Sequence, residues 1–410
     1  MIKSSYMAAA NAVLLVLAFG TTLADEPSTD VRTSTQKGTQ GERSAKILER
    51  IATKIESNLN RVHTWSSEWT LEETLTHPGF GNKTDPFGIP YSISQQGTVH
   101  FDADFQSGKM YIEFLPSTEA RFVEIASGKP LDSSRMQFGG MYRAVVTPEH
   151  LLSCDYGANM VDVEGFPSIP GLRANISRVS YRETTRIRER RPHLFDCRNF
   201  FKHFKGGFSY STYADYLKTY IEKLSDPTLP KDIAVDDIRN LISVTLSKQG
   251  EHKLYTVRIR KLDRRTKKEM FVTEIVFDSS VSMNPVSDTS IVLPQRKPFR
   301  QTLLHYKKEG GLFIPDVVTV KSWDYNDPDS PVSRESRIFT LQKSTLNQPI
   351  PPEAFSTEQF QWEYGDRFCD RIKNTLSVFD GEKLVPAQDF EYNPFKDLRL
   401  EALKAAERGN

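Results

Sequence analysis

The sequence feature that most constrains the fold is a series of three strand-like runs in the last third of the chain. The first two runs, 299–308 and 312–323, are rich in apolar and β-branched residues and are separated by a Gly-Gly pair. A cluster of Asp, Asn, Ser and Pro residues at 324–331 precedes the third run, 337–341. Runs of this kind with tight connections are typical of consecutive antiparallel strands.

The same texture occurs in two other parts of the chain. Apolar and polar residues alternate with a period of two, as expected for strands with one apolar face. The runs lie at 65–71, 99–105, 110–114, 122–126, 241–246, 254–259 and 271–277. A further hairpin is predicted over 378–385, with Asp-Gly as its turn. These patterns predict an α+β protein, in which a few helices accompany one large antiparallel sheet.

The apolar face of the upstream strands is large and aromatic. The alternation places these residues on one side: Trp65, Trp69, Phe101, Phe105, Ile112 and Phe114. A curled sheet would wrap around such a face and leave a cavity for an apolar ligand, whereas a filled core is the alternative. We therefore take these six residues as the candidate ligand-binding face.

The N-terminus predicts export. Lys3 precedes an apolar stretch at 7–19, and Thr22-Leu23-Ala24 supplies small residues at a cleavage site, so 1–24 reads as a signal peptide rather than an uncleaved anchor. Residues 25–43 are polar and read as a disordered leader. We expect a secreted or periplasmic protein without a transmembrane span in the mature chain.

Helices are predicted near the N-terminus, in the middle of the chain and at the C-terminus. Ser44 is expected to cap an amphipathic helix that runs to about Val62. The interval 147–226 reads as a helical insertion, beginning with a helix after Thr147 and ending with a tyrosine-rich helix that opens at Ser211 or Thr212.

The insertion would be a natural lid or plug for a curled sheet. The main domain is then 44–392. Asn393 caps a C-terminal helix and tail over 393–410.

The three cysteines allow one disulfide in an oxidising compartment. Cys154 and Cys197 flank the irregular middle of the chain and are the pair to test, with Cys369 left over. Three free, buried thiols are the alternative. The sequence has no CxxC motif, which excludes a zinc knuckle or a thioredoxin-type site.

No catalytic motif is recognisable, so we expect neither an enzyme, a metal site nor a cofactor. The histidines are scattered, and HExxH, GxSxG and Walker patterns are absent from the sequence. Asp366 and Asp370 could be paired carboxylates, although their alternation with arginine is more typical of a surface ion-pair ladder. The basic run 182–191 could meet an anionic headgroup, but interleaved acids favour a solvated strand. A formal net charge of +1 argues against nucleic acid as a partner.

The layout of the chain resembles a known family. A signal peptide, a first amphipathic helix, two runs of strands around a helical interruption and the hairpin over 309–316 are similar to the bacterial outer-membrane lipoprotein-sorting superfamily. The resemblance implies an unclosed antiparallel half-barrel, with helices packed on or plugging its concave apolar face. It also implies binding of lipid acyl chains there.

The sequence thus predicts a non-enzymatic protein that binds a lipid or lipoprotein acyl chain on its concave face. The alternative is a structural or protein-interaction module of the cell envelope with a filled core. A hydrolase with an inconspicuous carboxylate pair is the third reading.

Overall fold

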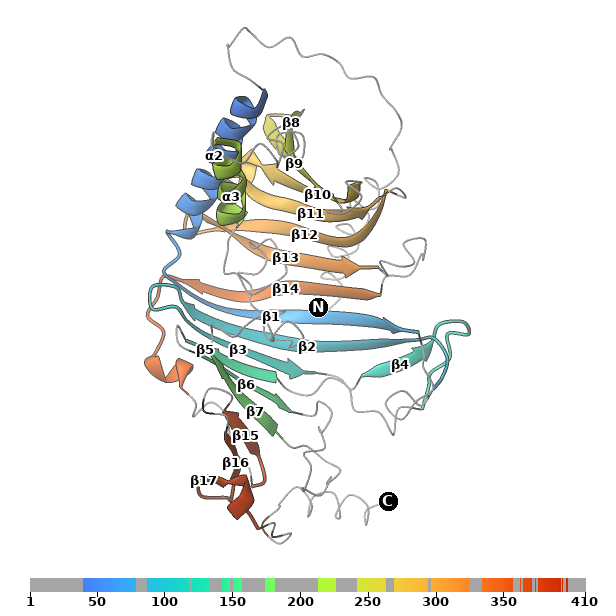
Figure 1. Ribbon diagram of the computed structural model, residues 1–410, viewed down its shortest axis with the longest axis vertical. Coiled ribbons are helices and arrows are strands. Elements are labelled where there is room, and N and C mark those ends of the chain that lie inside the picture. Colours follow the sequence, from blue (N-terminus) through green and yellow to red (C-terminus); the bar gives the residue numbers. More distant parts are fainter. Residues whose placement is uncertain are drawn as a thin grey trace, which may run out of the picture. The chain divides into compact units, whose positions relative to one another are not determined.

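The computed structural model describes the strand-rich part of the chain (Figure 1). The described residues are 40–78, 87–117, 120–132, 142–147, 150–156, 174–180, 213–225, 242–262, 269–293, 296–323, 334–356, 362, 364–370, 373, 375–391, 393 and 396. The predicted signal peptide, most of the leader, the basic run 182–191 and most of the C-terminal helix lie outside these residues.

The strands of the first half and those of the second half belong to one sheet. In the first half they are β1 (Thr64–His77), β2 (Tyr91–Asp104), β3 (Lys109–Pro116), β4 (Arg121–Glu124), β5 (Tyr142–Val146), β6 (His150–Tyr156) and β7 (Ala174–Ser180). In the second half they are β8 (Ile242–Gln249), β9 (His252–Leu262), β10 (Glu269–Asp278), β11 (Asn284–Val292), β12 (Lys297–Glu309), β13 (Leu312–Ser322), β14 (Glu335–Leu346), β15 (Arg367–Asp370), β16 (Thr375–Phe379) and β17 (Leu384–Pro386).

Two meanders meet at the pairing of β1 with β14. Strands β8 to β14 pair each with the next, and β14 then pairs with β1, which is followed by β2, β3, β5, β6 and β7. Strand β4 pairs with the free end of β2. Strands β15 to β17 extend the sheet beyond β7 through a parallel β7–β15 pair, while the other pairs are antiparallel. The predicted large antiparallel sheet is confirmed, and it is not closed.

The predicted tight turns are confirmed where glycine provides a positive φ. Gly310 and Gly311 have φ of 57° and 77° between β12 and β13. Gly381 has a φ of 98° between β16 and β17. In this turn the carboxylate of Asp380 accepts hydrogen bonds from the backbone N–H groups of Glu382 and Lys383. Left-handed backbone is accessible to glycine without steric penalty, which fixes these hairpins locally.

The predicted helix after Thr147 is wrong. Residues His150–Tyr156 form β6, which pairs on one side with β5 and on the other with β7. The Thr-Pro-Glu pattern is a local helix-start signal, but pairing along both edges of the segment overrides it. In the described residues, the interval 147–226 therefore contributes two strands, β6 and β7, to the sheet as well as the helix Tyr213–Ser225.

The described residues include two α-helices beside the sheet. Helix α2 (Gln40–Leu59) begins at Gln40 rather than at the predicted Ser44, so the predicted leader boundary at residue 43 falls inside it. Helix α3 (Tyr213–Ser225) begins directly after the predicted Thr212 cap. The two helices lie side by side and are joined by an ion pair between Lys218 and Glu56 (Figure 1). Neither helix, among the residues that can be described, is long and apolar enough to cross a membrane.

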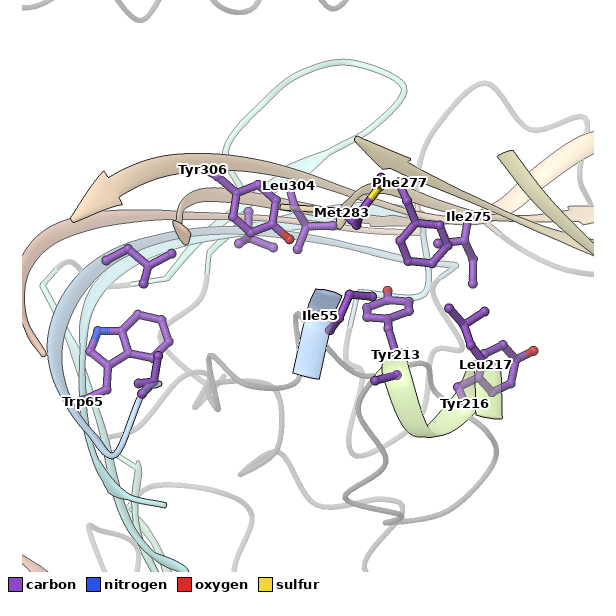
Figure 2. Close-up of a cluster of buried hydrophobic side chains, with 14 of the residues drawn as sticks. Ile55, Trp65, Tyr213, Tyr216, Leu217, Ile275, Phe277, Met283, Leu304 and Tyr306 are labelled. Carbon is purple, nitrogen blue, oxygen red and sulfur yellow. The ribbon is translucent and has the colours of Figure 1, made fainter. Parts of the chain in front are cut away.

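The helices pack on the sheet through their apolar stripes. In Figure 2, Ile55 of α2 and Tyr213 of α3 point toward Phe277 and Leu304 of the strands. The ring of Tyr213 meets that of Phe277 edge-on, with centroids 6.2 Å apart. The side-chain amide of Asn58 in α2 also bonds the backbone of Phe313, donating over 3.1 Å and accepting over 3.4 Å. Both helices are thus tied to the second half of the sheet.

Candidate ligand-binding face

The six residues of the predicted ligand-binding face gather in one cluster. Trp65, Trp69, Phe101, Ile112 and Phe114 are buried, and Phe105 packs against them from the turn after β2. Trp65 lies edge-on to Trp69 and to Phe101, with ring centroids 6.2 Å and 6.0 Å apart. We call the side of the sheet that carries these residues the aromatic face.

The indole N–H groups on the aromatic face are satisfied by serines. Trp69 donates to the hydroxyl of Ser67 over 2.9 Å, and Trp65 donates to that of Ser344 over 3.1 Å. The packing is close, because a Cβ added to Gly97 would lie 2.3 Å from the ring of Phe114. Glycine at this position lets the Phe114 ring lie directly against the strand.

The aromatic face continues across the junction of the two meanders. Opposed residues in an antiparallel pair project to the same side. Leu71 faces Phe339, Phe339 faces Val318, and Val318 faces Leu304. The sequence pattern identified these strands but not this row, because pairing of β1 with β14 joins segments about 270 residues apart.

A band of polar residues crosses the same side of the sheet next to that row. One row of the band runs over β10 to β14. The other runs over β11, β12, β14, β1 and β2, and Val320 of β13 interrupts it with an apolar side chain. The ten residues of this polar band are Thr273, Ser290, Arg300, Ser322, Glu335, Asp288, Thr302, Arg337, Glu73 and Gln95. Sequence reasoning missed the band, since its members come from strands whose order is visible only in the fold.

The polar band contains a buried ion triplet. The guanidinium of Arg337 lies 2.6 Å from a carboxylate oxygen of Glu73 through Nε and contacts Glu335 through a terminal nitrogen. Glu335 also accepts a hydrogen bond from the hydroxyl of Ser322 over 3.3 Å. Arg337 and Glu73 are both nearly inaccessible to solvent. Their mutual ion pair therefore replaces the hydration that each charged group would have in water.

The helix α3 reaches the band through a tyrosine. The hydroxyl of Tyr213 donates to the carboxylate of Asp288 over 2.8 Å. Burial, and then the adjacent Asp288 carboxylate, raises the pKa of Tyr213 well above its usual value. The hydroxyl therefore stays protonated and serves as a donor that ties α3 to the sheet.

Beyond the band lies a second apolar cluster. It consists of Tyr91, Ile93 and Phe122, with Leu75 and Phe87 packed against them. This side of the sheet thus presents an aromatic region, a polar band and a smaller apolar region in succession. Such an order suits an amphipathic molecule better than a purely apolar one.

The opposite side of the sheet carries alternating charges around a histidine. Lys343, Glu68, His100, Glu113 and Arg143 follow one another on neighbouring strands. Lys343 pairs with Glu68 at 3.0 Å, and Arg143 pairs with Glu113 at 2.5 Å. His100 bonds a sixth residue, Asp102, at 2.9 Å. A protonated His100 would complete the alternation of sign.

His100 is expected to make the stability of the protein depend on pH. The hydrogen bond that the His100 ring donates to the Asp102 carboxylate, reinforced by Glu113 and Glu68, raises the pKa of His100 above its usual 6.5, although burial opposes this. The stabilisation is therefore present below pH 6.5 and is lost as pH rises through the raised pKa. Because the side chain is 38% exposed, we expect less than about 1 kcal/mol.

The measurement is the urea midpoint of the wild type and of His100→Gln at pH 5.5 and 8.5. The two proteins should differ more at pH 5.5. The control is His252→Gln, at an exposed position of β9. A larger effect of His100→Gln at pH 8.5 would contradict the assignment.

The predicted surface ion-pair ladder at 366–371 is wrong. Asp366, Arg367 and Asp370 are buried, because β15 is an interior strand paired with both β7 and β16. One oxygen of Asp370 accepts a hydrogen bond from the backbone of Lys373 over 3.1 Å. Tertiary pairing thus buries charges that the local pattern would leave in solvent.

The remaining predicted sites are tested only in part. Cys154 lies in β6 and Cys369 in β15, but Cys197 is outside the described residues, so the disulfide stays a prediction. Within the described ranges, no group of His, Cys, Asp and Glu side chains has the arrangement of a metal site.

The fold and this face define a β-dominated protein built on a large antiparallel sheet that is not closed and carries few helices. No family model matches the chain, and no curated protein matches its sequence. The solved structures that are similar to the chain include two at 9% identity. One is a DUF1329 family protein from Desulfovibrio piger, with a TM-score of 0.34 over 78% of this chain and 99% of that one. The other is a beta-barrel-like protein of the domain of unknown function DUF1849 from Brucella abortus, with a TM-score of 0.16 over 70% and 99%.

Proposed function

We propose that this protein binds an acyl chain of a lipid or lipoprotein on its aromatic face, as a non-enzymatic component of the cell envelope or of the secreted fraction. The observation that carries the proposal is the continuous apolar surface that strands of both meanders contribute to one side of an unclosed sheet. Burial of an acyl chain there would contribute about 0.8 kcal/mol per methylene, which requires no catalytic group. The resemblance to the lipoprotein-sorting superfamily also supports binding of an acyl chain.

In this proposal α2 and α3 form a lid on the concave side of the sheet. Besides their apolar packing, they make specific polar contacts with the strands, among them the Tyr213–Asp288 hydrogen bond and the Asn58–Phe313 bonds. The Lys218–Glu56 ion pair joins the helices to each other. The two helices would therefore shift together when a chain enters, and the ligand would take over their contacts with the aromatic face.

The second candidate is an envelope interaction module with a filled core. The observation that favours it is the complete burial of Trp69 and Phe101, together with the close approach of Phe114 to Gly97. In this reading the side chains of the aromatic face serve only to fill the hydrophobic core, and an envelope protein binds elsewhere on the molecule.

Quenching of tryptophan fluorescence by a dibrominated fatty acid separates the two candidates. The variant W323F/W362F keeps Trp65 and Trp69 on the aromatic face, whereas W65F/W69F/W323F keeps Trp362, which packs on Phe368 and Phe379. Acyl binding predicts saturable quenching of the first variant and none of the second. Absence of quenching in both variants, together with an unchanged mass after native purification from the envelope fraction, would favour the interaction module.

A further inference from the structure

We infer that the polar band binds the positively charged end of an amphiphile whose acyl chain lies on the aromatic face. This inference rests on the proposed function and adds the chemical class of the headgroup, an ammonium group. It starts from the charges of the buried triplet. Glu73 and Arg337 have side chains only 8% and 9% exposed, and Glu335 is 26% exposed.

The triplet carries an excess of one negative charge. One guanidinium lies between two carboxylates, and Arg337 contacts both of them. The remaining charged members of the band, Asp288 and Arg300, add one charge of each sign and leave the excess unchanged. A carboxylate with little access to water is stabilised by a nearby cation, so an incoming ammonium group would be favoured and an anionic headgroup would be repelled.

Glu335 is the carboxylate that a headgroup can reach. It is the most exposed member of the triplet, and within the described residues its second oxygen accepts a single hydrogen bond, the 3.3 Å bond from Ser322. The hydroxyls of Ser322, Ser290 and Thr302 lie on the same side of neighbouring strands and offer acceptors for further ammonium N–H groups.

The spacing between the band and the aromatic face suits one continuous ligand. Glu335 and Phe339 lie on the same strand, four positions apart, which is about 13 Å at 3.3 Å per residue. A headgroup at Glu335 would thus direct its chain along β14 to the row of Phe339, Leu71 and Val318. The apolar and polar portions of an amphiphile would each meet a matching surface.

The test compares three amphiphiles that share one chain and differ in charge: dodecylamine, dodecanol and dodecanoate, each below its micelle concentration at pH 7. Calorimetric titration of the wild type is expected to show dodecylammonium binding about tenfold tighter than dodecanol, with dodecanoate the weakest. The variant Glu335→Gln is expected to bind dodecylammonium and dodecanol equally, because the carboxylate that discriminates between them is gone.

The matched control is Glu274→Gln. Glu274 is 23% exposed and pairs with Arg258, but it lies on the other side of the sheet, so this variant should keep the wild-type preference. Equal binding of the three amphiphiles by the wild type, tighter binding of dodecanoate, or a preference that survives Glu335→Gln would each overturn the inference. The wild-type comparison decides the matter even if Glu335→Gln does not fold. Failure of all three amphiphiles to bind would instead overturn the proposed function.

Discussion

Replacing Arg337 with methionine is expected to lower the free energy of unfolding by about 3–5 kcal/mol. The substitution keeps much of the side-chain volume but leaves the carboxylates of Glu73 and Glu335 without their common cation. A buried charge without a partner loses its hydration and gains nothing in return, which makes this one of the most damaging single changes in the sheet. Urea denaturation followed by circular dichroism gives the value.

Two further variants establish that the loss comes from the buried charge. Arg258→Met removes an arginine that also pairs with a glutamate but is 54% exposed, and it should lower stability by at most about 1 kcal/mol. The double variant Glu73→Gln with Arg337→Met should recover part of the loss, since one of the uncompensated carboxylates is gone. A loss below about 1 kcal/mol for Arg337→Met alone would show that the triplet is solvated.

Truncating Trp69 to alanine is expected to lower the free energy of unfolding by about 3–5 kcal/mol. Trp69 is fully buried, lies against Trp65 and bonds Ser67, so the change removes a large apolar contact and opens a cavity. Thermal and urea denaturation both measure the effect. Leu246→Ala, at a residue 54% exposed, is the control and should change stability by less than about 0.5 kcal/mol. A similarly small effect of Trp69→Ala would mean that the aromatic face carries little of the stability.

Strand positions could be predicted because their signals are local. The alternation from Trp65 to Leu71 is contained in a few residues, and so is the turn at Gly310-Gly311. The six residues of the aromatic face followed from the same alternation, and the structure brings them together.

The polar band and the corrections share a different origin. The band exists because β14 pairs with β1, and a single sequence contains no signal for which distant strands become neighbours. The two corrections also depend on distant neighbours. Strand β6 pairs with β5 and β7 in spite of a local helix-start pattern. Asp366 and Asp370 are buried because β15 has a partner strand on each side. Local patterns predicted the strands and helices. Which side chains are buried, and which charged groups lie together, depends on the neighbours of each strand.

The pairing of β1 with β14 also sets the order in which the chain can fold. One edge of β1 is covered by β2, which follows it closely in the sequence, but the other edge is covered by residues 335–346. A chain emerging from the ribosome or from a translocation channel therefore presents β1 as an uncovered edge strand until most of its length is available. Uncovered edges invite pairing with other chains. A chain truncated before residue 335 should consequently aggregate rather than form half of the sheet.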